Sequence, residues 1–162
     1  MNVELRLLRD EDWQQVMLLQ AEVYGAAFTE PLTVLKDKQR LGPQSCWGMW
    51  LDERMVGYCL AHPWQASAPP PLGQMGLRET NVEWLMYLHD MAVGRAAQGQ
   101  GLAASVLKAL AEYARQEGYT RMALVAVQGA SAYWQRQGFE QMMSQKSLKE
   151  YGDDACYMVK AL

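Results

Sequence analysis

The residues with the clearest chemical potential form a glycine-rich turn between an apolar run and a long amphipathic segment, within Leu88–Ala114. Gly94, Gly99 and Gly101 follow the apolar run that ends at Val93, and apolar residues then recur at helical spacing. A turn that opens a helix points several backbone N–H groups at one spot, where the helix dipole adds partial positive charge. Glycine has no Cβ to keep a ligand away from the backbone. The stretch therefore predicts a strand, a turn and a helix that bind a phosphate or pyrophosphate.

The spacing of this turn excludes two common phosphate motifs. Ala104 stands where a dinucleotide-binding G-x-G-x-x-G would need its third glycine, and no Gly-Lys-Ser/Thr of a Walker loop follows. The pattern that fits is Gln98-x-x-Gly101-x-Ala103, five residues after Val93. It resembles the acyl-coenzyme A pyrophosphate loop, Q/R-x-x-G-x-G/A, of the GNAT superfamily of N-acetyltransferases. The resemblance covers about the whole chain in element order, with specific motifs in 85–103 and 124–139.

A second segment, Ala130–Phe139, resembles the later GNAT motif N-x-x-A-x-x-F/L-Y-x-x-x-G-F. Ala130, Gly138 and Phe139 match it. Val127 stands where the motif has an asparagine, so the side-chain contact of that asparagine to the coenzyme is lost unless Gln128 supplies it. Trp134 replaces the tyrosine that protonates the leaving thiolate in many members, and tryptophan has no proton to give.

The resemblance implies a site between two parting strands. The backbone of Met91 and Val93 would bind the acyl carbonyl and the pantetheine arm, and the turn amides would hold the pyrophosphate. The implied coenzyme-binding residues are Met91, Ala92, Val93, Gln98, Gly99, Gln100, Gly101, Leu102 and Ala103. Arg95 replaces a proline of the family pattern; its two interpretations are a contact to a coenzyme phosphate and a solvated turn residue.

Candidate catalytic residues lie in both motifs. A histidine, with an ordinary pKa near 6.5, is suited to deprotonate an amine, and His89 lies four residues before Val93. The alternative role of His89 is a hydrogen-bonded core histidine. Arylalkylamine N-acetyltransferases, which belong to the same superfamily, also carry a histidine at that place. Asp90 is interpreted as an orienting group for His89, an amine ligand or a cap of a bulge. Tyr133 is the remaining candidate acid; its alternative role is a packed aromatic.

Composition narrows the class of protein. The chain has 162 residues, half of them apolar, and a net charge of −3, which favours one domain over residues 1–162 and disfavours nucleic-acid binding. No apolar stretch reaches the length of a membrane span, and the N-terminus has no signal-peptide pattern. Three scattered cysteines and two distant histidines predict reduced thiols, a cytoplasmic protein and no metal site.

The pattern of elements predicts an α/β fold. Expected strands are 3–7, 45–51, 55–61, 84–93 and 121–127, with the last strands in 140–149 and 154–160. His62-Pro63-Trp64 is expected to end the third strand. Strands 84–93 and 121–127 flank a helical crossover and should be parallel. The GNAT resemblance adds a central, splayed mixed sheet flanked by helices, in the order β-α-α-β-β-β-α-β-α-β-β.

The first two helices and one long connection are expected to face the acceptor. An amphipathic helix follows Asp10-Glu11-Asp12 and ends at Gly25, and a shorter helix spans about 31–41. Glu22, Tyr24 and Phe28 are plausible acceptor contacts there, with helix-end packing as the alternative. The connection 65–83 is interpreted either as a gating lid or as a mobile loop.

The predicted function is transfer of an acetyl group from acetyl-coenzyme A to a primary amine of a small molecule or peptide, by direct attack in a ternary complex. No cysteine lies near either motif, which disfavours an acyl-cysteine route. Two alternatives remain: a non-catalytic acyl-coenzyme A sensor, and an acyltransferase that uses a longer acyl donor. A homodimer is also kept open, with Tyr151 and Tyr157 as residues that face either a partner or the substrate.

Overall fold

The computed structural model describes residues 2–65, 69, 83–127, 129–142, 148 and 154–162. The elements in chain order are β1 (Glu4–Leu7), α1 (Trp13–Tyr24), α2 (Leu32–Leu41), β2 (Cys46–Leu51), β3 (Arg54–Gln65), β4 (Trp84–Val93), α3 (Leu102–Gln116), β5 (Arg121–Ala126), α4 (Ser131–Arg136), β6 (Glu140–Met142) and β7 (Cys156–Ala161). This is the predicted order. Short 3-10 turns also occur at Asp10–Asp12, Ala26–Phe28 and Arg95–Ala97.

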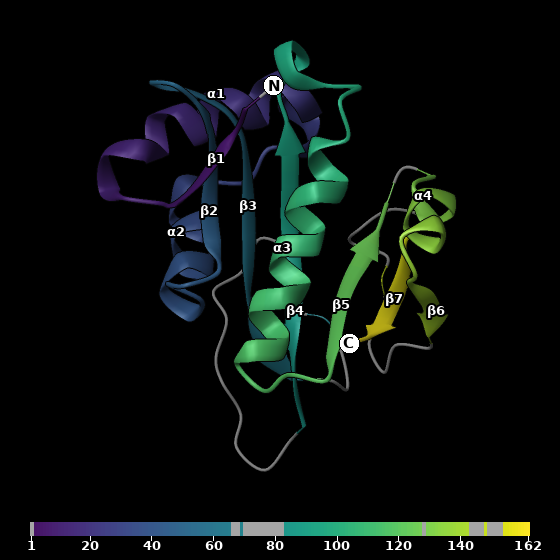
Figure 1. Ribbon diagram of the computed structural model, residues 1–162. Helices are drawn as coiled ribbons and strands as arrows, with labels where there is room; N and C mark the ends of the chain where they lie inside the picture. The colour runs from purple at the N-terminus through teal and green to yellow at the C-terminus, as the bar shows by residue number, and fades with distance from the viewer. Residues whose placement is uncertain (1, 66–68, 70–82, 128, 143–147, 149–153) are drawn as a thin grey trace.

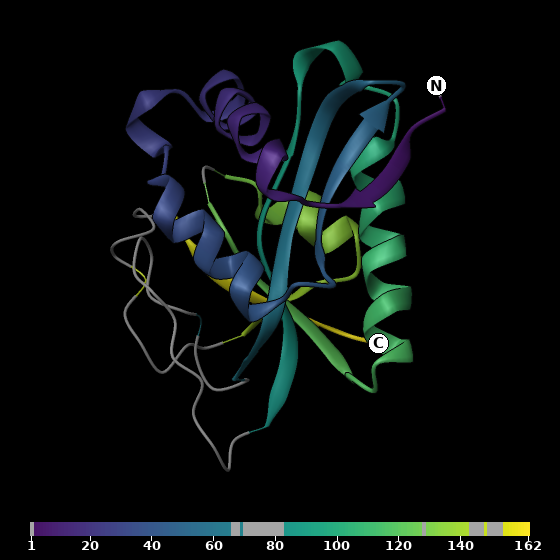
Figure 2. The same cartoon turned by 90° about the vertical axis from the view of Figure 1, so that its left-hand side faces the viewer.

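The strands form one seven-stranded sheet in the order β1-β2-β3-β4-β5-β7-β6. Every neighbouring pair is antiparallel except β4 and β5, which are parallel as the crossover through α3 requires. Helices α1 and α2 cover one face and α3 covers the other (Figures 1 and 2). The prediction of an α/β fold with a mixed sheet flanked by helices is confirmed.

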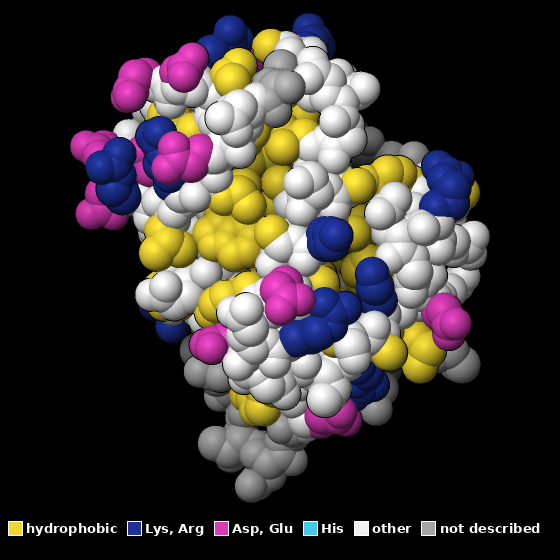
Figure 3. All heavy atoms as spheres, in the orientation of Figure 1, with side chains coloured by type: hydrophobic (Ala, Val, Ile, Leu, Met, Phe, Trp, Pro, Cys, Tyr) yellow, Lys and Arg dark blue, Asp and Glu magenta, His cyan; other side chains and the backbone are white. Residues whose placement is uncertain are grey.

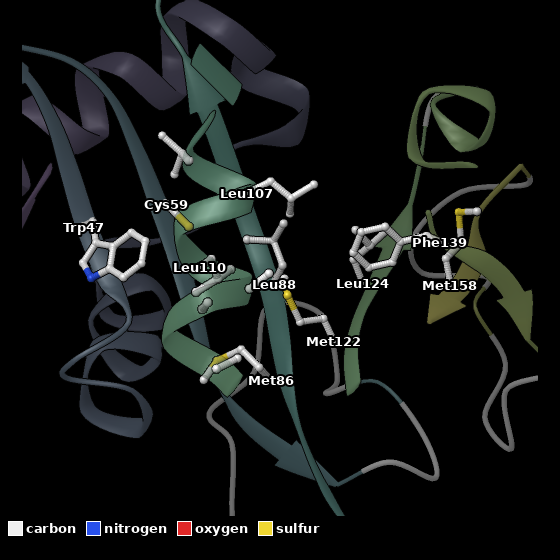
Figure 4. Packing of buried hydrophobic residues seen from close by; sticks show 14 of the residues in the cluster. Trp47, Cys59, Met86, Leu88, Leu107, Leu110, Met122, Leu124, Phe139 and Met158 are labelled. Carbon is white, nitrogen blue, oxygen red and sulfur yellow. The ribbon is translucent and has the colours of Figure 1, made fainter. Parts of the chain in front are cut away.

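The two faces of the sheet bury separate hydrophobic clusters. The larger cluster lies under α3 and extends to β5 and β7, where Leu124, Phe139 and Met158 lie near one another (Figure 4). The second cluster joins α1 to β2 and β3 through side chains such as Trp13 and Tyr58. Strand β4 contributes to both clusters, because Leu88 faces α3 and Ala92 faces α1. The central strand is thus held from both sides.

The end of β3 differs from the sequence prediction. The strand does not stop at His62-Pro63-Trp64 but continues to Gln65, paired with β4. Strand β2 is paired with β3 only as far as Leu60, so Pro63 lies where β3 has a single neighbouring strand. A proline is tolerated there because one side of the strand needs no hydrogen-bond donor.

Several expectations concern segments that the structure describes in part or not at all. Most of the connection 65–83, together with Gln128 and Tyr151, lies outside the described residues. Tyr157 is described; it is buried with Tyr87 and Ala123 in a third cluster, and so faces the interior. Over the described residues, no helix is long and apolar enough to span a membrane.

An apolar groove lies beside α3 on its β1–β2 side (Figure 3). Its volume is about 420 Å³, and its lining includes Leu5, Leu7, Trp47 and Tyr113. Strand β5 lies on the other side of α3 (Figure 1). The groove is therefore separate from the opening between β4 and β5.

Candidate active site

Strands β4 and β5 part after a short paired stretch. Over the described residues of both strands, the pairing consists of Met86 with Met122 and Tyr87 with Ala123. Strand β4 continues to Val93 and β5 to Ala126, and the ribbons diverge visibly (Figure 1). From Leu88 onward, the edge of β4 that faces β5 is therefore open to a ligand.

The register of β3 and β4 shows which backbone groups face this opening. Gly94 N donates to Val56 O at 2.8 Å, one residue beyond the Gly57–Val93 pair. That pair is therefore of the non-hydrogen-bonded type, so the N–H and C=O of Val93 point away from β3. Met91 has the same orientation and Ala92 the opposite one. The opening is thus lined by the main chain of Met91 and Val93, while that of Ala92 faces β3.

The turn after β4 presents the predicted cluster of amides. Gly101, the N-cap residue of α3, has φ +71°, and the first helical hydrogen bond runs from Ser105 N to Gly101 O at 3.1 Å. The amides of Leu102 and Ala103 therefore precede the helical ladder. A Cβ at Gly99 or Gly101 would meet nothing within 4 Å, so the space in front of the turn is open. This arrangement suits a pyrophosphate.

Other residues of the turn hold it in place. Gln98 donates from its amide to Val93 O at 3.0 Å, which ties the turn to the end of β4. The carboxylate of Glu22 accepts the N–H of Arg95 at 2.8 Å. Gly94 has no room for a side chain, because a Cβ would come within 2.9 Å of Leu19 and 3.1 Å of Val56 O. Glu22, considered an acceptor contact, thus fixes the turn against α1.

A bulge in β4 lies beside the opening. Leu60 pairs with Asp90 and Ala61 with Leu88, so His89 is the extra residue. The bulge turns His89 and Asp90 toward the helices α1 and α2, since both side chains bond to residues from that region. His89 Nε2 lies 2.7 Å from Glu30 Oε1, and these side chains are 4% and 15% exposed. Asp90 follows the extra residue of the bulge, and capping of a bulge is one of the roles that the sequence indicated for it.

Asp90 is bound by two tyrosines. The hydroxyl of Tyr58 donates to one carboxylate oxygen and lies 2.6 Å from it, and the hydroxyl of Tyr24 lies 2.6 Å from the other. The Tyr24 hydroxyl is also 3.1 Å from Met91 O. Burial raises the pKa of Asp90, and the two hydroxyls act in the opposite direction. Burial, followed by the charge of Asp90, raises the pKa of Tyr24 and Tyr58.

The second motif supplies aromatic packing. Trp134 packs against the cluster under α3, with its ring centroid 5.7 Å from that of Phe139. Tyr133 is partly exposed and contacts Trp134 edge-on at 5.0 Å between ring centroids. The tryptophan at the tyrosine position of the motif is thus a partly buried residue that packs against the core. Phe28, in the 3-10 turn Ala26–Phe28 that follows α1, is 58% exposed.

The structure brings together residues that the sequence had separated. His89, Asp90 and the main chain of Met91 were predicted site residues, but Glu30, Gln20 and Tyr58 were not. Glu30 lies 59 positions from His89 in the chain, so no local pattern connects them. Within the described part of the chain, no group of three or more His, Cys, Asp and Glu residues could hold a metal.

The fold is shared with several solved structures. Ard1 from Thermoplasma volcanium has 14% sequence identity and a TM-score of 0.75, covering 100% of this chain and 99% of the other. The ribosomal-protein-S18-alanine N-acetyltransferase from Escherichia coli has 15% identity and a TM-score of 0.72, covering 99% and 94%. The GNAT-like decarboxylase GphF, in complex with isobutyryl-CoA, has 16% identity and a TM-score of 0.80, covering 98% of each chain. At identities this low, the likeness establishes the fold.

Comparison of sequences adds the family. No curated protein sequence matches the chain significantly. The sequence model described as the acetyltransferase (GNAT) family matches residues 11–139, which is most of the chain and includes both motifs and the opening between β4 and β5. The chain therefore belongs to the acetyltransferase (GNAT) family.

Proposed function

We propose that the protein transfers an acetyl group from acetyl-coenzyme A to a primary amine, by direct attack in a ternary complex. The observation that carries this proposal is the position of the His89 bulge beside the opening between β4 and β5. A proton acceptor and a slot for a thioester thus share one strand. Family membership supports acyl transfer, and the open amides at the start of α3 support a coenzyme A donor.

In this proposal the coenzyme is held by main-chain groups. The amides of residues 99–103 bind the pyrophosphate, with Gln98 holding the turn to β4. The outward-facing main chain of Met91 and Val93 binds the pantetheine arm and the acyl carbonyl. Amide donors aimed at that carbonyl oxygen stabilise the negative charge that develops when an amine attacks.

His89 is the proposed base. It takes the proton of the attacking amine, directly or through one water, while the nitrogen–carbon bond forms and the carbon–sulfur bond breaks. The imidazolium then returns the proton to solvent. The thiolate, whose ordinary pKa is near 8.5, needs little help to leave, and Tyr133 is the proposed donor of a proton to it. The three buried free thiols fit a reducing compartment, and we place the activity in the cytoplasm.

The test is release of free thiol from acetyl-coenzyme A over a panel of small amines, amino acids, aminoglycosides and peptide N-termini. We expect turnover with at least one class, and His89→Gln should lower kcat/KM by about 100-fold or more. Coenzyme A affinity, measured by calorimetry, should not change in this variant. Unchanged kinetics of His89→Gln between pH 6 and 9 would exclude His89 as the base.

The panel also separates the alternatives. Trp134 and Val127 depart from the family motif, which favours a sensor of acyl-coenzyme A as the second candidate function. Tight binding of acetyl-coenzyme A with no turnover of any amine would support that sensor. Tighter binding of longer acyl thioesters would point instead to a different acyl donor.

A further inference from the structure

We propose that Glu30 is the positioning residue for His89: its carboxylate accepts the Nε2–H of the ring, fixes one tautomer and leaves Nδ1 as the basic nitrogen. This inference rests on the proposed function, in which His89 is the base. Glu30 Oε1 lies 2.7 Å from His89 Nε2, within the range of a short, charge-assisted hydrogen bond. With Glu30 ionised, as this proposal requires, its carboxylate can only accept, which puts the proton of the hydrogen bond on Nε2.

Glu30 is itself held by α1. The side-chain amide of Gln20 accepts the N–H of Glu30 at 2.9 Å and donates to its carbonyl at 3.2 Å. Gln20 therefore binds both main-chain groups of one residue, and its own side chain is 1% exposed. This buried, two-point contact holds the main chain of Glu30 against α1. The hydrogen bonds from Gln20 to Glu30 and from Glu30 to His89 thus connect α1 to the bulge of β4.

The charges around the pair determine what Glu30 contributes during the reaction. Asp90 follows His89 on β4. His62 of β3 interacts electrostatically with His89, and Lys38 of α2 interacts electrostatically with Glu30. Lys38 is buried, which lowers its pKa, while the charges of Glu30 and Asp37 act in the opposite direction. When His89 gains a proton at Nδ1, the new positive charge lies directly beside the Glu30 carboxylate. The pair then becomes a buried ion pair, which stabilises the protonated ring.

The first test is nitrogen NMR of the imidazole rings, which does not depend on turnover. The chain has two histidines. His62 Nδ1 lies 2.9 Å from Pro63 O, which can only accept, so His62 carries its proton on Nδ1. His89 should show the opposite tautomer, with the proton on Nε2. His62 is thus an internal reference in every spectrum.

Two variants separate orientation from charge. Glu30→Ala removes the acceptor, so His89 should lose its single tautomer and kcat should fall about 10- to 100-fold, with KM for acetyl-coenzyme A unchanged. Glu30→Gln keeps a carbonyl oxygen but removes the charge. The acidic limb of its kcat/KM profile should move to lower pH, because the protonated ring has lost its counter-charge. Glu112→Gln, an exposed carboxylate on α3, is the matched control.

The outcomes distinguish this inference from the proposed function. A wild-type His89 with its proton on Nδ1, or a ring spectrum that is unchanged in Glu30→Ala, overturns the assignment of Glu30. A tautomer that depends on Glu30, in a protein that acetylates no amine, supports the pair and rejects the proposed function. Equal pH profiles for Glu30→Gln and Glu112→Gln would reject the role of the charge.

Discussion

Asp90 shows how one buried carboxylate can determine the geometry around it. Its two oxygens each lie 2.6 Å from a tyrosine hydroxyl, one from α1 and one from β3. Tyr58 is fully buried, whereas Tyr24 also lies 3.1 Å from Met91 O at the edge of the opening. The carboxylate therefore links helix α1 to both central strands, directly beside the proposed base.

We predict that Tyr58→Phe and Tyr24→Phe each lower the free energy of unfolding by about 1–3 kcal/mol. Each change leaves one oxygen of a buried carboxylate without its donor. Urea unfolding of the single and double variants measures the loss in free energy of unfolding. The two losses should not add, since both hydroxyls donate to the same carboxylate. Tyr24→Phe should also lower kcat/KM more than Tyr58→Phe does.

The control is Tyr113→Phe on α3, whose hydroxyl makes only a 3.5 Å contact to an exposed glutamate among the described residues. This variant should change the unfolding free energy by less than about 0.5 kcal/mol. If the three tyrosine variants were equally stable, the two hydroxyl partners of Asp90 would contribute nothing measurable to the free energy of unfolding.

At the scale of elements, the turn between β4 and α3 combines three constraints. Gly94 is packed against α1, Gln98 is bonded to Val93 O, and Gly99 and Gly101 have positive φ with open space before them. The first two constraints fix the turn, and the third exposes its amides. A side chain at Gly101 would extend into open space at the start of α3, where the amides of Leu102 and Ala103 also lie.

We predict that Gly101→Asn raises the Kd for coenzyme A about 10-fold or more. Asparagine tolerates the left-handed conformation, so the effect reports blocking of the amides more than backbone strain. Gly118→Asn is the matched control, because Gly118 has φ +89°, open space around it, and a place at the opposite end of α3. Titration calorimetry should show normal coenzyme A affinity for Gly118→Asn. Thermal unfolding should show a similar small loss of Tm for the two asparagine variants. Equal affinities would exclude the turn as the pyrophosphate site.

Elements defined by local patterns were predictable from the sequence, and contacts between elements were not. The bounds of α1 and β4 follow from periodicity and from Gly25, and the parallel pair follows from the handedness of the crossover. The continuation of β3 through Pro63 depends on where β2 ends, which no residue near Pro63 encodes. The Glu30–His89 and Tyr58–Asp90 contacts depend on the bulge and on packing of α1. These contacts required the structure.

At the scale of the whole molecule, the sheet separates a polar and an apolar side. The face under α3 buries a continuous hydrophobic cluster, whereas the face under α1 and α2 also buries Gln20, Lys38 and His62. Lys38 Nζ and His62 Nε2 have no hydrogen-bond partner within the described residues. Such groups are costly to bury in their charged form. The polar side therefore makes the stability of the molecule sensitive to pH.

We predict that His62 makes the protein less stable in mild acid. Burial lowers its pKa to about 3, whereas the unfolded chain binds a proton near the ordinary pKa of about 6.5. As the pH falls below that ordinary value, the unfolded chain gains a proton that the folded protein does not, so the free energy of unfolding decreases. Between about pH 8 and pH 5 this amounts to about 2 kcal/mol. Urea unfolding of wild type and His62→Asn across this range isolates the contribution, since the amide of asparagine can still donate to Pro63 O but does not titrate. The wild type should lose about 2 kcal/mol more than the variant, and parallel pH dependences would show that His62 is protonated in the folded protein as readily as in the unfolded chain.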